Sequence, residues 1–129
     1  MFSHIMLGSN DLQKSLDFYD AVLGALGIAP GAAVPNKPRY VWSSPTGRLV
    51  VTTPLDGQPA TAGNGSTIGF VAQSTQQIDT AHAAGVAAGG TSIESPPGWR
   101  GEGAGRMYLA YLRDPTGNKI CLFHRPATV

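Results

Sequence analysis

Apolar residues recur at helical spacing in two stretches of the chain, one in each half. Residues 12–26 follow Ser9-Asn10-Asp11, three residues that favour helix N-caps, and they stop at Gly27. A second stretch begins after Ser74-Thr75 and ends near Gly89-Gly90. The pattern therefore predicts one amphipathic helix in each half.

Short apolar runs bounded by turn residues predict strands on both sides of each helix. These runs cover residues 2–8, 39–43, 48–53, 66–72, 108–112 and 119–123. The tripeptide Pro-Thr-Gly recurs at 45–47 and 115–117, in the last hairpin of each half. This repetition predicts one domain, 1–129, made of two tandem βαβββ repeats at about 1–57 and 64–126. We expect an α+β fold whose sheets form a curved, partly open cup with the helices packed outside.

Composition and charge exclude several classes of protein. The chain has 129 residues, 42% of them hydrophobic and 13% charged, with a formal net charge of +1. This balance offers no electrostatic footprint for nucleic acid or for an acidic membrane surface. The single cysteine cannot build a disulfide framework, and no signal peptide or membrane-spanning run is evident. We therefore expect a cytoplasmic protein that binds neither nucleic acid nor membrane.

Strand alternation predicts which side chains enter the cup. On the first strand, Ile5 and Leu7 share one face, and His4 lies on the other. On the last strand, Ile120 and Leu122 oppose Cys121 in the same way. The more apolar faces should lie under the helices, which places His4 and Cys121 in the cup.

Two segments resemble the vicinal oxygen chelate superfamily. The first runs from His4-Ile5-Met6-Leu7 through Asp11-Leu12-Gln13-Lys14-Ser15 to Phe18-Tyr19, and the second is the closing YLRDPTGNKI at 111–120. That superfamily includes glyoxalase I, bleomycin-resistance proteins and extradiol dioxygenases. With the repeat, the resemblance covers nearly the whole chain and implies the cup fold. It does not define the activity, because the superfamily hosts several chemistries on one scaffold.

The resemblance also implies four positions for metal ligands. Metal enzymes of the superfamily typically use one ligand, commonly His or Glu, from the first and last strand of each repeat. The matching positions here are His4, Val50, Thr67 and Cys121. Valine donates nothing, and a neutral threonine hydroxyl competes poorly with water. We expect no cofactor and no tightly bound metal; the alternative is a divalent ion held through His4 and Cys121.

Cys121 itself has three possible roles. Free cysteines are among the most buried residue types, which favours a small apolar residue that fills space in the cup. A nucleophile would require a neighbour that lowers the thiol pKa, a role His4 would fill if the first and last strands converge. A metal ligand would require further donors that the equivalent positions do not supply.

Aromatic and basic residues extend the candidate pocket. We expect Tyr40 and Trp42 to share the Val50 face with Arg48, where they would suit a flat or anionic small molecule. The alternative role for this set is cross-strand packing.

Residues 95–106, SPPGWRGEGAGR, are rich in glycine and proline. We interpret this segment as a loop, and loops of this length often act as lids or binding loops. Trp99 and Arg100 are its candidate contacts with a ligand.

Two functions remain open from the sequence. One is a metal-free protein that binds a small molecule in the cup, as bleomycin-resistance proteins do. The other is a metal-dependent glyoxalase-like lyase or dioxygenase-type enzyme that uses His4 with non-standard ligands. In either case we expect a homodimer, because relatives commonly pair so that two chains complete each other's pockets.

Overall fold

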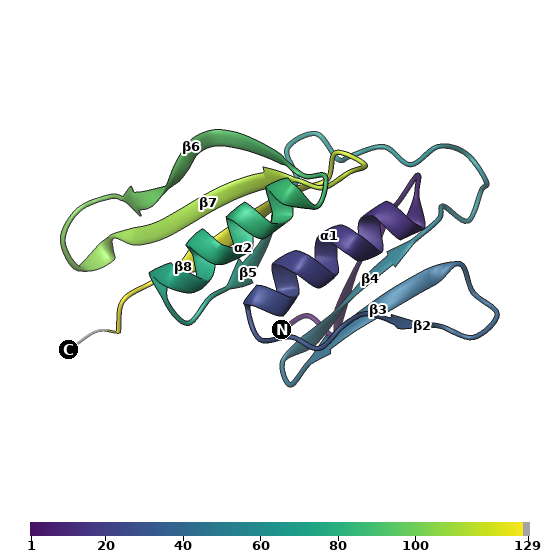
Figure 1. The fold of residues 1–129 in the computed structure, drawn as a ribbon, viewed down its shortest axis with the longest axis horizontal. Helices are drawn as coiled ribbons and strands as arrows, with labels where there is room; N and C mark the ends of the chain where they lie inside the picture. Colours follow the sequence, from purple (N-terminus) through teal and green to yellow (C-terminus); the bar gives the residue numbers. More distant parts are fainter. Residues whose placement is uncertain (128–129) are drawn as a thin grey trace.

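The computed structural model describes residues 1–127 and confirms the α+β fold class, with two four-stranded sheets and two helices (Figure 1). The first module contains β1 (His4–Gly8), α1 (Leu12–Ala25), β2 (Ala32–Ala33), β3 (Arg39–Ser44) and β4 (Gly47–Thr52). The second contains β5 (Ile68–Val71), α2 (Thr75–Ala87), β6 (Thr91–Arg100), the 3₁₀ helix η1 (Gly103–Gly105), β7 (Met107–Arg113) and β8 (Lys119–His124). Within the described range, neither helix is long and apolar enough to span a membrane.

Both helices begin at side-chain caps. The Asp11 carboxylate accepts a hydrogen bond from the Lys14 amide at 3.1 Å, and the Ser74 hydroxyl accepts one from the Gln77 amide at 3.1 Å. Each cap satisfies one of the amide groups that the first helical turn leaves free. The helix starts were therefore encoded locally, and the cap residues predicted from the sequence include the ones used.

The two sheets have equivalent strand orders, β1-β4-β3-β2 and β5-β8-β7-β6. The first strand of each module runs parallel to the last strand, and the remaining pairs are antiparallel. No ladder joins the two sheets across residues 1–127, so β1 and β5 are edge strands. Each sheet packs a helix on one face, and we call the other side its free face.

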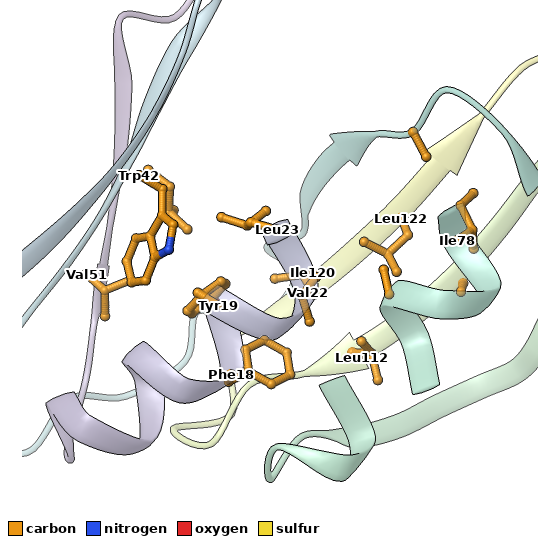
Figure 2. Close-up of a cluster of buried hydrophobic side chains, with 14 residues drawn as sticks. Phe18, Tyr19, Val22, Leu23, Trp42, Val51, Ile78, Leu112, Ile120 and Leu122 are labelled. Carbon is orange, nitrogen blue, oxygen red and sulfur yellow. The ribbon is translucent and has the colours of Figure 1, made fainter. Parts of the chain in front are cut away.

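The two helices contact one another and share one hydrophobic core with both sheets (Figure 2). From α1, Phe18 and Val22 pack toward the second module, and Tyr19 lies near Trp42 of the first sheet, with ring centroids 5.5 Å apart. Gly85 of α2 permits this approach, since a Cβ atom there would lie 2.8 Å from Val22 Cγ2. The modules are thus joined by close helix packing.

The predicted loop at 95–106 is partly wrong. Its first six residues belong to β6, which pairs with β7 through Arg100, and the register shifts between Ile93 and Gly98. β6 is the outer strand of its sheet, where proline does not interrupt a central ladder. Only the segment after Arg100, including η1, is irregular or 3₁₀. The sequence pattern also identified no separate range for β2.

Candidate functional site

The free face of the first sheet carries His4 beside a basic residue and an apolar patch. The parallel register pairs His4 with Arg48 and Met6 with Val50, and β3 places Val41 next to Val50. Val50 is only 7% exposed, whereas His4 is exposed. His4 Nδ1 lies 2.8 Å from the Ser3 hydroxyl. This face therefore offers one imidazole and one guanidinium around aliphatic side chains.

The prediction that Tyr40 and Trp42 share the Val50 face is wrong. The hairpin turn has two central residues, so Ser44 pairs with Gly47 and even-numbered positions oppose odd-numbered ones. Trp42 therefore pairs with Leu49 on the helix side, where it is 2% exposed. Its indole nitrogen donates to Asp20 Oδ1 at 2.9 Å, which satisfies the buried N–H. Trp42 is a core residue, and the cross-strand packing alternative describes it.

The free face of the second sheet carries Cys121. The register pairs it with Tyr111 on β7 and with Gly69 on β5. The neighbouring pair on this face is Leu109 with Phe123. Cys121 is 7% exposed, so the thiol is largely enclosed by its neighbours.

The environment of Cys121 favours the neutral thiol. Burial raises its pKa and outweighs a lowering effect of the neighbouring Tyr111 side chain. Burial likewise raises the pKa of Tyr111, and the neighbouring Cys121 adds to that rise. A protonated thiol is a weak nucleophile and a weak metal ligand. These properties support the space-filling role for Cys121.

An ion pair that the sequence did not indicate lies beside Cys121. Lys119 Nζ contacts Glu94 Oε2 at 3.1 Å and stands 4.8 Å above the centre of the Tyr111 ring. Glu94 lies at the β6 irregularity with φ of 59°, a left-handed conformation uncommon for a residue other than glycine. Alternation alone would have placed Lys119 on the Cys121 face. Nothing in the local pattern indicated that Glu94 would reach it.

The four metal-equivalent positions do not provide a suitable donor set. The structure supports their equivalence, because Met6 pairs with Val50 as Gly69 pairs with Cys121, each two positions after His4 or Thr67. The donors at these positions are one imidazole, one hydroxyl and one protonated thiol. Among residues 1–127, no three His, Cys, Asp or Glu side chains are grouped so that they could hold a metal ion. Catalytic zinc usually has three protein ligands, so these residues do not fit it.

Trp99 and Arg100 point to opposite sides of β6. Trp99 pairs with Tyr108, whose hydroxyl donates to Asp79 of α2 at 2.6 Å, so Trp99 lies on the helix side. Its ring packs edge-to-face on Tyr108 and beneath the Arg106 guanidinium, 4.2 Å away. Arg100 Nη2 donates to the backbone oxygens of residues 95 and 96. The structure therefore does not bring Trp99 to the Cys121 face.

A cavity of about 570 Å³ lies between the modules, beside the edge strands β1 and β5 and the end of α1. Three of the candidate site residues line this cavity: His4, Trp42 and Arg48. Thr67 lines a separate cavity of about 470 Å³. The remaining candidates, Tyr40, Val50, Trp99, Arg100 and Cys121, line neither. Within residues 1–127, neither of these two cavities gathers all the predicted site residues.

Comparison with known proteins agrees with this architecture. Residues 1–122 match the family model of the glyoxalase/bleomycin resistance protein/dioxygenase superfamily. A glyoxalase/bleomycin resistance protein from Albidiferax ferrireducens T118 has a solved structure that is 62% identical with a TM-score of 0.92, covering 97% of this chain and 99% of that one. No curated protein matches.

More distant structures share the fold alone. A glyoxalase-related enzyme from Fulvimarina pelagi is 20% identical with a TM-score of 0.73, covering 98% of this chain and 88% of that one. A glyoxalase/bleomycin resistance protein/dioxygenase family enzyme from Burkholderia phytofirmans PsJN is 19% identical with a TM-score of 0.71, covering 96% and 98%. At this level of identity these structures carry no information about the chemistry of this chain.

Proposed function

The chain belongs to the glyoxalase/bleomycin resistance protein/dioxygenase superfamily, and we propose that it binds a small organic molecule without a catalytic metal. The observation that carries this proposal is the donor set at His4, Val50, Thr67 and Cys121. Only the imidazole is an effective neutral ligand. The thiol would have to ionise against a pKa that burial raises.

The free faces of the sheets are the proposed ligand surface. On the second sheet, Tyr111, Phe123 and Leu109 supply aromatic and aliphatic contacts around the buried thiol. On the first, His4 and Arg48 supply polar groups at one end of the Met6–Val50 pair. A mostly apolar surface with a few polar groups is typical of small-molecule sites.

We also propose that the protein is a homodimer in which a second copy completes this surface. Each of the edge strands β1 and β5 has one row of backbone hydrogen-bonding groups with no ladder partner among residues 1–127. Apolar residues are exposed on both strands, with Met6 46% and Val71 68% accessible. Unprotected edge strands of this kind favour association with another chain. A monomeric mass in solution across micromolar concentrations would contradict the dimer.

Elemental analysis of purified protein tests the absence of a metal. We expect less than stoichiometric zinc, nickel, iron or manganese in the natural protein and in His4→Gln. His82→Gln is the matched control. It removes the imidazole that shares a hydrogen bond with the Ser92 hydroxyl and is not one of the four metal-equivalent positions. Stoichiometric metal that disappears with His4→Gln and remains in His82→Gln would instead support a metal-dependent lyase or dioxygenase-type enzyme.

A thermal-shift screen of small organic molecules tests ligand binding, because a ligand that binds only the folded state raises the melting temperature. We expect at least one compound to produce a saturable rise. Replacement of Phe123 by Ala should reduce that rise, and replacement of the exposed Leu55 by Ala should not. Equal responses of the two variants would refute the placement of the ligand on the free face of the second sheet.

A further inference from the structure

The second cavity differs in chemistry from the first. Its volume is about 470 Å³, and its lining consists of Ala62, Gly63, Asn64, Gly65, Ser66, Thr67, Arg113 and Lys119. No acidic side chain is among these residues, and two are cations. Residues 62–67, which we call the connector, lie between β4 and β5 and form part of the lining. The end of β7 and the start of β8 supply the positive charge through Arg113 and Lys119.

The two cations are directly opposite each other across the β7–β8 ladder. Like charges in this position destabilise a sheet unless a counter-charge separates them. Lys119 has Glu94 as its partner at 3.1 Å, but Arg113 makes no ion pair with any described residue. Arg113 Nη1 donates to the Gly117 carbonyl at 2.9 Å, which holds the guanidinium, and its other N–H groups donate to no residue that the structure describes. An anion in the cavity would neutralise this excess charge.

The connector residues that line the same cavity carry further hydrogen-bond donors in their backbone amides. Gly65 has φ of +91°, and the Ser66 amide closes a turn onto the Gly63 carbonyl at 3.3 Å. A Cβ atom on Gly63 would lie 2.6 Å from Ser66 Oγ, so the turn is tight at this point. The amides of residues 63, 64 and 65 have no acceptor within the described chain. Successive free amides in a turn with a left-handed residue form a concave site that suits anions.

We propose that this cavity binds the oxyanion group, a phosphate or a carboxylate, of a small acidic molecule. Arg113 would contribute planar paired donors, Lys119 a point charge, and the connector amides and the Ser66 hydroxyl the remaining hydrogen bonds. Lys119, Cys121 and Phe123 share one face of β8, so the rest of the molecule would extend along that face toward Phe123. That extension rests on the proposed function, whereas the anion site itself does not.

Titration with inorganic phosphate and, separately, with acetate tests the site by amide NMR on the full chain at constant ionic strength. We expect saturable shifts at Gly63, Asn64 and Gly65. Saturable shifts with phosphate but not with acetate would indicate that the site takes a phosphate group. Saturable shifts with acetate would indicate that it also takes a carboxylate. If neither ion produces saturable shifts at these amides, the proposal is wrong.

Variants of the two cations provide the second measurement. Arg113→Met and Lys119→Met should each weaken binding of the effective ion by at least about tenfold, the loss expected for one charge-assisted contact. Lys14→Met, which removes an exposed cation on α1, is the control and should leave the affinity unchanged. Because Lys119→Met also breaks the Glu94 ion pair, Arg113→Met decides the result if the other variant unfolds. Equal weakening by Lys14→Met and Arg113→Met would show general charge screening and overturn the site.

The outcomes separate this inference from the proposed function. If neither phosphate nor acetate produces saturable amide shifts, while an organic ligand binds over Phe123, the anion site is refuted and the proposed function stands. A saturable phosphate response with no organic ligand found would instead contradict the small-molecule function and leave the anion site in place.

Discussion

Replacement of Gly85 by alanine tests whether close helix contact joins the two modules. Gly85 is buried on α2, where it faces α1 and β7. A methyl group there would lie 2.8 Å from Val22 Cγ2, 2.9 Å from Leu112 Cδ1 and 3.2 Å from Phe18 Cε2. All three neighbours are buried in the shared core, so none can move without disturbing its own packing.

Two opposing effects determine the magnitude. Glycine inside a helix is about 0.5–1 kcal/mol less favourable than alanine, so the substitution gains that amount from helix propensity. Overpacking a filled core costs about 1–3 kcal/mol. We therefore expect Gly85→Ala to lower the free energy of unfolding by about 1 kcal/mol, with packing outweighing propensity.

Gly24→Ala is the matched control because it makes the same chemical change on α1. No atom lies within 4 Å of a Cβ built at Gly24, so only the propensity gain remains. We expect this variant to be more stable than the natural protein by about 0.5–1 kcal/mol. The difference between the two variants isolates the packing cost.

Urea unfolding at one protein concentration measures both free energies, since association would otherwise shift the apparent stability. Equal stabilisation by Gly85→Ala and Gly24→Ala would show that space exists between the helices. The inference that the modules are joined by tight packing at Gly85 would then fail.

Three further predictions concern protonation and assembly. Tyr19→Phe should cost about 1.5–3 kcal/mol, because the buried hydroxyl donates to the Asp114 carboxylate at 2.7 Å. Burial, with a smaller effect of Asp114, raises the pKa of Tyr19 well above its ordinary value. The free energy of unfolding should therefore fall as pH rises above about 10, where the phenol of the unfolded chain ionises. If urea unfolding shows the same decrease with pH above about 10 in Tyr19→Phe as in the natural protein, this prediction is wrong. Cys121 should react slowly with a disulfide reagent at pH 7 and faster as pH rises, because burial raises its pKa; reaction at the rate of a free thiol at pH 7 would restore the nucleophile hypothesis. Met6→Lys and Val71→Lys should each shift the mass measured by light scattering toward the monomer, whereas Leu55→Lys should not, since Leu55 lies outside both edge strands.

Local sequence signals determined the elements and much of the strand orientation. The Asp11 and Ser74 caps define where the helices start, and alternation placed His4 and Cys121 opposite the apolar positions that face the helices. These features depend on residues a few positions apart. A sequence carries that information directly, which is why the fold class followed from it.

Features that depend on register could be decided only by the tertiary structure. Trp42 lies in the core because the two-residue turn between β3 and β4 pairs it with Leu49 on the helix side. The repeat pattern in the sequence does not specify this register. The glycine- and proline-rich stretch after residue 94 forms a strand because it occupies a sheet edge, where a missing N–H is tolerated.

The candidate anion site was likewise outside the reach of local patterns. Arg113 and Lys119 belong to neighbouring strands, but the amides of residues 63–65 come from a connector about 50 positions earlier. Glu94 reaches Lys119 through a left-handed backbone conformation at a register shift. Periodicity describes which way a side chain points along its own strand. Which distant segments meet there depends on long-range packing, and only the folded chain specifies it.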